Sequence, residues 1–210
     1  MTRSLGVILA GGRASRMGGG DKALLEIGGQ TLLQQVIDRL QPQVGAMALN
    51  ANGDPERFAM FGLPVVPDSI AGRPGPLAGV LAGLDWAATQ GADNIVTVAA
   101  DTPFFPRTLV AHLEETAEGM AQPLVLAATP RGAERTKSMS RSGLIRHPTF
   151  GLWPVALRTD LRAALEEGIK KVVVWTEKHG GREAVFLIDT CDPFFNVNTP
   201  EDLEAAKAMA

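Results

Sequence analysis

The sequence predicts a single-domain α/β fold built on a doubly wound, mostly parallel sheet. Three observations predict it. Short apolar runs alternate with helical segments through the first half of the chain, and parallel strands need such crossover connections. The run from Ile95 to Ala100 is nearly all apolar, as in a central strand covered on both faces. The length of 210 residues suffices for one well-cored domain but is short for two.

The first half of the chain contains alternating strands and helices. The expected strands are Leu5 to Leu9, Met47 to Asn50, Leu63 to Val66 and Ile95 to Ala100. A helix begins after Thr31, which forms a capping box with Gln34. A short helix follows Asp54 through Phe61, and a third is marked by the apolar stripe Leu77, Val80, Leu81 and Leu84.

The second half is less regular, and we expect part of it to add an antiparallel section. The expected strands lie near Leu124–Ala128, Phe150–Trp153, Val172–Trp175 and Ala184–Ile188, with helices near Leu161–Glu167 and Glu201–Met209. Thr199 caps the last helix, with Pro200 in its first position.

A basic stretch from Arg131 to Arg146 reads as a long loop without regular structure. It carries five basic residues together with glycines and serines. Loops of this length are uncommon inside compact domains and are usually mobile or functional. Two interpretations stay open: a mobile, solvated loop, or a loop that closes over an anionic substrate.

Composition excludes several classes of protein. Twenty basic and 23 acidic residues give a net charge of −3, so no global attraction to nucleic acid or an anionic membrane is expected. Cys191 is the single cysteine, which excludes an intrachain disulfide, and no zinc-type spacing occurs. No apolar segment approaches the roughly 18 residues of a membrane span, and none at the start resembles a signal peptide. We therefore expect a cytoplasmic protein.

The segment from Leu9 to Lys22 is the strongest local signal of chemistry. A strand ends in a glycine turn and a loop carrying Arg16 and Lys22. Glycines let backbone N–H groups approach phosphate oxygens, and the two cations can neutralise charge on a phosphoryl centre. The segment is not a P-loop, and no GxGxxG follows the strand. The alternative is a basic, glycine-rich surface loop.

Carboxylates and amides follow other strands. Asp101 comes directly after a buried strand and is well placed to hold Mg²⁺, or else forms a turn or helix cap before Pro103. Asp68 has the same ambiguity, while Asn50 can serve a turn or bind a sugar or base. Asn196 and Asn198 alternate in an extended segment, so both can face a ligand or only bond the strand end.

Together these segments resemble a known family. Leu9 to Lys22 is similar to the signature loop of sugar-phosphate and cofactor nucleotidyltransferases. Four further segments resemble molybdenum cofactor guanylyltransferases: Asn50-Ala51-Asn52, Pro74 to Gly79, Asp101-Thr102-Pro103 and Asn196 to Pro200. Their order spans about Leu5 to Leu203. The resemblance implies a Rossmann-like sheet of the nucleotide-diphospho-sugar transferase type.

The resemblance also implies site residues. Those implied to bind the nucleotide are Leu9, Ala10, Gly11, Gly12, Lys22, Asn50, Asp68, Gly79 and Asp101. Lys22 would contact the GTP phosphates beside Arg16, and Asp101 would hold Mg²⁺; these three form the implied catalytic set. Asn50, Asp68 and Gly79 would line the base and ribose region. Asn196 and Asn198 would face the pterin.

One segment resembles the family and one departs from it. His147-Pro148-Thr149 resembles a family segment, although we expect His147 to be structural. Ala133 to Ile145 looks like an insertion, which leaves any role of its basic residues open.

The implied reaction transfers GMP from GTP to the phosphate of molybdenum-molybdopterin and releases pyrophosphate. Transient contacts with molybdenum-insertion and molybdoenzyme-maturation proteins are implied, and a monomer is the default expectation. Two alternatives remain. One is a transferase of the same fold that uses CTP or a sugar phosphate. The other is a non-catalytic carrier of the pterin cofactor, which would not need Asp101 as a metal ligand.

Overall fold

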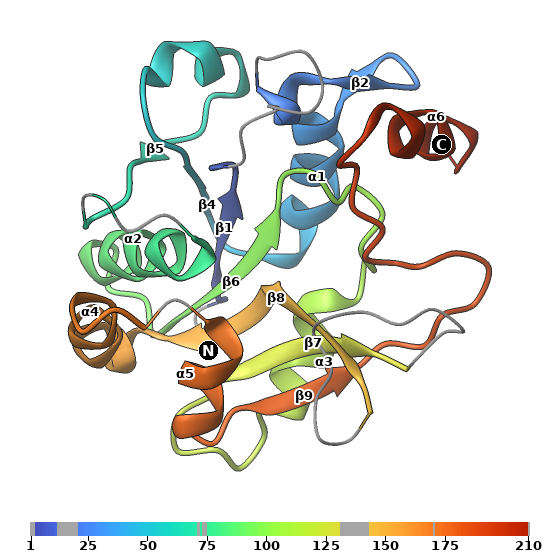
Figure 1. Cartoon of the computed structure of the whole chain (residues 1–210). Coiled ribbons are helices and arrows are strands. Elements are labelled where there is room, and N and C mark those ends of the chain that lie inside the picture. The colour runs from blue at the N-terminus through green and yellow to red at the C-terminus, as the bar shows by residue number, and fades with distance from the viewer. Residues whose placement is uncertain are drawn as a thin grey trace.

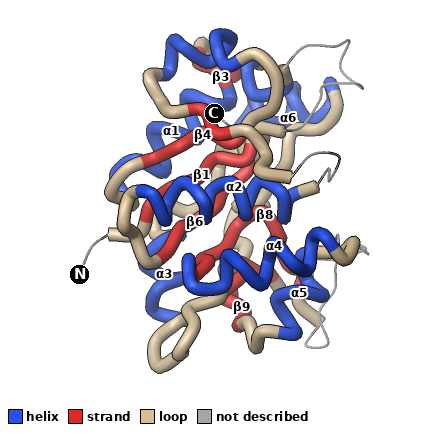
Figure 2. The backbone as a smooth tube through the Cα atoms, turned by 90° about the vertical axis from the view of Figure 1, so that its left-hand side faces the viewer, coloured by secondary structure: helices blue, strands red, loops and turns tan. Residues whose placement is uncertain are grey.

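A seven-stranded sheet runs through the described part of the protein, in the order β5-β4-β1-β6-β8-β7-β9 (Figures 1 and 2). The fold was obtained as a computed structural model that describes residues 3–11, 21–70, 72, 75–130, 143–169 and 171–209. The strands are β1 (Leu5–Leu9), β4 (Met47–Asn50), β5 (Val65–Val66), β6 (Asn94–Ala99), β7 (Val125–Thr129), β8 (Ile145–Pro154) and β9 (Arg182–Val185).

Only β8 runs against the others in this sheet of the described residues. β1 pairs in parallel with β4 and β6, β4 with β5, and β7 with β9, whereas β8 pairs antiparallel with both β6 and β7. The prediction of a doubly wound, mostly parallel sheet with a short antiparallel section is therefore confirmed.

Helices cover both faces of the sheet (Figure 2). They are α1 (Leu32–Leu40), α2 (Pro76–Thr89), α3 (Leu109–Thr116), α4 (Arg158–Glu166), α5 (Val172–Lys178) and α6 (Pro200–Met209). Successive strand side chains point to opposite faces. Ile8 accordingly packs in the cluster that contains α1 and α3, whereas Val7 packs in the cluster that contains α2, α4 and α5.

A small hairpin and the last helix form a third, smaller cluster. The hairpin consists of β2 (Glu26–Ile27) and β3 (Gln30–Thr31). Ile27 of the hairpin packs with Leu32 of α1, with Ala206 of α6 and with Val197 in the segment before that helix. This packing brings the end of the chain beside its first helix.

The predicted N-cap residues are confirmed, but the Gln34 side chain donates to Asp38 and no bond that would complete a capping box with Thr31 is found among the described residues. The Thr31 hydroxyl accepts a hydrogen bond from the Gln34 amide at 3.1 Å, and the Asp54 carboxylate accepts one from the Glu56 amide at 3.0 Å. The helix after Asp54 is of the 3-10 type and spans Pro55–Phe61. Thr199 caps α6 by accepting from the Asp202 amide at 3.2 Å.

Three sequence predictions are wrong or incomplete. The run Val172–Trp175 was expected as a strand but forms the first turn of α5. Helix α3 and the hairpin β2–β3 were not predicted. The basic loop was expected to extend through Arg146, but Ile145 and Arg146 already belong to β8. Residues 131–142 of the expected loop lie outside the described residues.

Arg146 has a structural role in the sheet. It forms ion pairs with Glu183 of β9 and with Glu177 of α5, the latter at 2.8 Å. These contacts tie the start of β8 to α5 and to β9.

No helix among the described residues is both long and apolar enough to cross a membrane.

Candidate functional site

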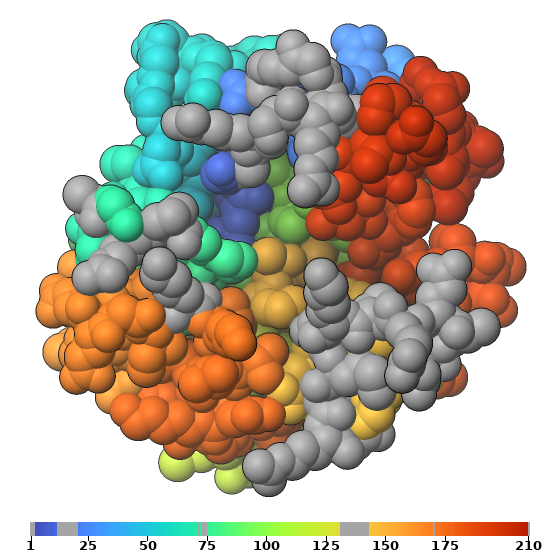
Figure 3. Space-filling view, viewed as in Figure 1, coloured from blue at the N-terminus to red at the C-terminus, as the bar shows by residue number. Residues whose placement is uncertain are grey.

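A pocket of about 330 Å³ lies at the carboxyl ends of the parallel strands. In open α/β sheets, ligands bind outside these strand ends. In Figure 3 the end of β1 (dark blue), β6 (green) and β8 (yellow-orange) form the floor of a hollow in the centre of the visible face. The pocket is lined by Leu9, Gly11, Asn50, Asn52, Asp68, Gly75, Pro76, Ala99, Asp101, Thr149 and Asn196.

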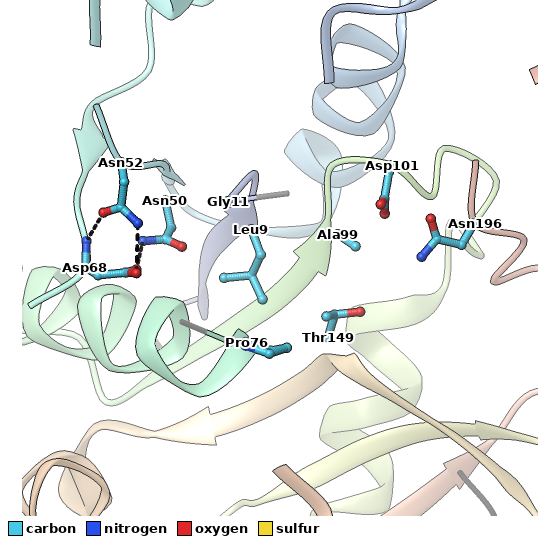
Figure 4. A pocket seen from close by; sticks show the side chains of 11 residues that line it. Leu9, Gly11, Asn50, Asn52, Asp68, Pro76, Ala99, Asp101, Thr149 and Asn196 are labelled. Carbon is cyan, nitrogen blue, oxygen red and sulfur yellow. Dashed lines mark hydrogen bonds between the residues drawn. The ribbon is translucent and has the colours of Figure 1, made fainter. Parts of the chain in front are cut away.

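One end of the pocket is a network of two amides and a carboxylate (Figure 4). Asn50 Nδ2 donates to Asp68 Oδ1 at 3.0 Å, and Asn52 Nδ2 donates to Asp68 Oδ2 at 2.8 Å. The Asp68 amide in turn donates to Asn52 Oδ1 at 2.9 Å. Both carboxylate oxygens of Asp68 are thus held in fixed directions beside the pocket.

Asn52 belongs to the segment Asn50-Ala51-Asn52 that resembles the family, but it is not one of the implied site residues. Its two bonds to Asp68 show that it fixes the loop after β5. The repeat of asparagine at alternate positions, Asn50 and Asn52, is the signal that points to it.

Gly79 packs closely against Asn50 of this network. It lies on α2 and is absent from the residues that line the pocket. A Cβ atom at Gly79 would lie 2.3 Å from Asn50 Oδ1 and 2.9 Å from Leu9 Cδ2. Gly79 therefore allows α2 to approach the end of β4 closely, and its part in binding the base and ribose stays a prediction.

The other end of the pocket carries a cation and a carboxylate. Lys22 Nζ lies 2.8 Å from Asp101 Oδ2 and also donates to the side-chain oxygen of Asn198. The side chain of Lys22 is 10% exposed and that of Asp101 is 21% exposed. Lys22 thus contacts two residues, Asp101 and Asn198, that lie 79 and 176 positions later in the chain.

The segment from Asn196 to Asn198 is fixed beside Asp101. The Val197 amide donates to the Asp101 carbonyl oxygen at 2.9 Å. The Asp202 carboxylate accepts from the amides of Asn198 and Thr199 at 2.9 and 2.8 Å. Asn196 lines the pocket on the same side as Asp101 (Figure 4), whereas Asn198 contacts Lys22. The two asparagines therefore point to different neighbours.

The glycine turn begins where the sequence placed it. Leu9 and Gly11 line the pocket, and the Ala10 amide donates to the Asn50 carbonyl oxygen at 2.9 Å. Ala10 itself is buried beneath this turn. Gly12 and Arg16 lie outside the described residues.

Thr149 was not predicted as a site residue. The pairing of β7 with β8 jumps from Leu126–Gly151 to Ala127–His147, so Pro148, Thr149 and Phe150 have no partners in β7. Such bulges often redirect a side chain next to a site. Figure 4 shows Thr149 on the pocket wall below Asp101.

His147, just before this bulge, contacts an aromatic cluster. Its ring stacks on Phe194 at 4.2 Å, and its Nε2 lies 3.0 Å from Thr129 Oγ1. Burial lowers the pKa of His147 to about 4, although Asp192 opposes the shift. The imidazole is therefore neutral at pH 7 and does not line the pocket, which agrees with the structural role expected for it.

The chemistry at Asp101 suits a metal ion that a nucleotide brings with it. No group of three or more His, Cys, Asp or Glu side chains gathers within the described ranges, so a cage made by protein alone is not found there. Mg²⁺ is usually held by one or two carboxylates plus substrate phosphates. Asp101, with the side-chain amide of Asn196 on the same side of the pocket, offers this kind of donor set.

Known proteins are similar to this chain in sequence and in fold. A molybdenum cofactor guanylyltransferase of a Bradyrhizobium strain is 50% identical over 98% of this chain and 92% of its own. One from Nitrobacter hamburgensis is 48% identical over 98% and 93%. The crystal structure of molybdopterin-guanine dinucleotide biosynthesis protein A from Archaeoglobus fulgidus has a TM-score of 0.70 at 20% identity, over 98% of this chain and 97% of its own.

The model of the MobA-like NTP transferase domain matches residues 6–181. This match includes all of β1 except Leu5, together with Lys22, the Asn50–Asp68 network and Asp101. The chain therefore belongs to the MobA-like NTP transferase family and is a nucleotidyltransferase related to the molybdenum cofactor guanylyltransferases.

Proposed function

We propose that this enzyme transfers GMP from GTP to the phosphate of molybdenum-molybdopterin and releases pyrophosphate. The single observation that carries the proposal is the pairing of Lys22 with Asp101 at the pocket, in a chain about half identical to guanylyltransferases of the molybdenum cofactor. A non-catalytic carrier would not need Asp101 as a metal ligand at this position.

The pocket has two ends of different chemistry, and we assign one substrate to each. The nucleotide base and ribose lie against Asn50 and Asp68, and the backbone from Leu9 to Gly11 supports the phosphates. Gly12 and Arg16, outside the described residues, stay candidates for contact with the phosphates by resemblance to the family. The pterin lies toward Asn196 and Thr149, so that its phosphate reaches the α-phosphorus near Asp101.

The reaction is an in-line displacement. The terminal phosphate of molybdopterin attacks the α-phosphorus of GTP, the bond to the bridging oxygen of the β-phosphate breaks, and pyrophosphate leaves. The nucleophile needs no general base because it is already ionised near neutral pH. Catalysis consists of positioning and charge stabilisation, in which Lys22 neutralises phosphoryl charge and Asn198 holds the Lys22 ammonium group.

Both substrates are anions, so we also propose that Mg²⁺ is required. Asp101 would hold the ion, and the ion, when bound, offsets the negative charge of the phosphates. Lys22 is ion-paired with Asp101 in this structure, and phosphates compete with Asp101 for that ammonium group once the nucleotide binds.

The cellular setting of the reaction is also part of the proposal. We place it in the cytoplasm, where GTP is available and a free, exposed cysteine such as Cys191 stays reduced. The protein acts as a monomer that contacts molybdenum-insertion and molybdoenzyme-maturation proteins transiently.

The test is to incubate the pure protein with Mg²⁺, molybdate-loaded molybdopterin and either GTP or CTP, and to measure pyrophosphate. Release with GTP alone is expected. Release with CTP alone would overturn the choice of nucleotide. Release with neither, while GTP still raises the melting temperature, would show that the acceptor is a different phosphate.

A further inference from the structure

A second cavity, of about 320 Å³, is lined by residues of the hairpin, α1, the segment after Asp101 and α6. None of its lining residues belongs to the nucleotide pocket. The lining residues are Ile27, Gly28, Gln30, Gln35, Asp38, Arg39, Pro103, Phe104, Arg107 and Met209. The cavity is therefore walled in part by the segment that follows Asp101.

Two guanidinium groups line this cavity without a carboxylate partner. Among the ion pairs of the described residues, none includes Arg39 or Arg107. Arg39 Nη1 donates to the Phe105 carbonyl oxygen at 3.0 Å, which fixes its direction and leaves its charge uncompensated. Arg107 is exposed and lines the same cavity.

The one acidic residue of the lining is held by amides. Asp38 accepts from Gln34 Nε2 at 2.7 Å and from Gln30 Nε2 at 3.4 Å. No ion pair joins Asp38 to Arg39 among the described residues, and the lining holds two cations against this one carboxylate. The cavity wall retains an excess of positive charge.

The electrostatics agree with this description. Burial lowers the pKa of Arg39, and the charge of Arg107 lowers it further. Two like charges that are close and partly desolvated repel each other, and a bound anion would remove that cost. Guanidinium groups bind phosphate through paired, charge-assisted hydrogen bonds.

We infer that this cavity, here named the Arg39–Arg107 cavity, is a second anion site that takes a small phosphate anion. Its chemistry suits inorganic phosphate or pyrophosphate, which share the tetrahedral phosphoryl group. The site is independent of the nucleotide pocket, because no residue is shared between them.

Binding of phosphate and of pyrophosphate is measured by calorimetry on the full chain. The Lys22→Ala variant weakens the nucleotide pocket, and Arg107→Gln removes an exposed cation from the second cavity. We expect binding to persist in Lys22→Ala and to weaken at least tenfold in Arg107→Gln. The matched control Arg158→Gln removes an arginine that pairs with Asp85 elsewhere, and it should bind as the wild type does.

The outcomes separate the two sites. Binding lost in Lys22→Ala and kept in Arg107→Gln would place the anion in the nucleotide pocket alone and overturn the inference. Equal binding of succinate at matched ionic strength would overturn the phosphate assignment. Whichever of phosphate and pyrophosphate binds with the lower Kd identifies the ligand. A second variant, Arg39→Gln, should weaken binding in the same way, with its melting curve as the check on folding.

Discussion

Asp101 combines a position at the end of a central strand with two close partners, Lys22 and Thr102. Its Oδ2 accepts from Lys22, and its Oδ1 lies 3.3 Å from the Thr102 hydroxyl. Both contacts come from side chains, so the backbone does not depend on the carboxylate. Removing the carboxylate should therefore affect chemistry more than folding.

The change Asp101→Ala is expected to reduce the rate of GMP transfer by a factor of roughly a hundred or more, since the charge that offsets phosphate repulsion is no longer held in place. The measurement is the initial rate of pyrophosphate release, with circular dichroism to confirm the fold. Asp189→Ala removes an exposed carboxylate and is the matched control. Transfer by Asp101→Ala at the wild-type rate would eliminate the metal assignment.

His147 gives the protein a predictable sensitivity to acid. Its folded-state pKa of about 4 is lower than the unfolded value of 6.5, so the unfolded chain binds more protons between these values. Stability contributed by the neutral imidazole is present above pH 6.5 and is lost as the pH falls toward 4. The loss at pH 4 should be roughly 2 to 3 kcal/mol in the free energy of unfolding.

The change His147→Gln removes this titration and keeps a polar group next to Thr129. Urea unfolding of both proteins at a series of pH values between 7 and 4 measures the difference. The variant should lose less stability than the wild type over this range. Parallel curves for the two proteins would show that His147 does not carry the effect.

Helix α2 supports the nucleotide pocket by its close approach to β1 and β4. The change Gly79→Ala puts a methyl group against Asn50 Oδ1, which should displace Asn50 and break its bond to Asp68. We expect a higher KM for GTP and a loss of about 1–3 kcal/mol of stability. Gly83→Ala, one turn later, contacts Val7 and Ile95 and is the matched control. It should destabilise the fold and leave KM unchanged; an equal rise in KM in both variants would refute the role of Gly79.

Strand β8 brings Thr149 to the pocket because its pairing with β7 is interrupted. The change Thr149→Val keeps the shape and removes the hydroxyl. Loss of one hydrogen bond should raise KM for molybdopterin by roughly three- to tenfold and leave KM for GTP unchanged. Steady-state kinetics with each substrate varied in turn measures this. Thr149→Ser should behave as the wild type does, and a change confined to GTP would move Thr149 to the nucleotide side.

The same elements show what the sequence could predict. The strands β1, β4 and β6 and the cap at Thr31 follow from local patterns, and so do the residues at the strand ends. Val172–Trp175 favours a strand by composition, yet Val172, Trp175 and Thr176 are buried at helical spacing in α5. Trp175 Nε1 also donates to Asp160 of α4 at 3.0 Å. Such tertiary contacts decide whether this segment forms a strand or a helix, and the local sequence pattern does not reveal them.

The position of the site residues was predictable, but their contacts were not. Asp101, Asp68 and Asn50 were expected at one edge because parallel strands end there. That Asn198 would contact Lys22, and that Gly79 would lie behind Asn50, depends on how α2 and the segment before α6 pack. Thr149 was noted only within the family-like segment His147-Pro148-Thr149, because the bulge that brings it to the pocket has no clear signature in one sequence.

At the scale of the whole molecule, the pocket is assembled from segments far apart in the chain. β1, β4, β6, β8 and the segment after Asp192 all contribute lining residues. Because binding at such a site requires the native arrangement, a ligand that binds only the folded state raises its stability. GTP is therefore expected to stabilise the entire sheet and not one loop.

A thermal melt with GTP and Mg²⁺ tests this coupling. At a concentration about a hundred times Kd, the gain of roughly 2.7 kcal/mol should raise Tm by roughly 5–10 °C for a chain of this size. Addition of EDTA should remove most of the shift if Asp101 holds the ion, and Asp101→Ala should show a reduced shift with or without EDTA. An unchanged shift in EDTA would mean that GTP binds through Lys22 and the backbone without a metal. A shift with CTP equal to that with GTP would mean that base choice is made in the chemical step and not in binding at Asn50 and Asp68.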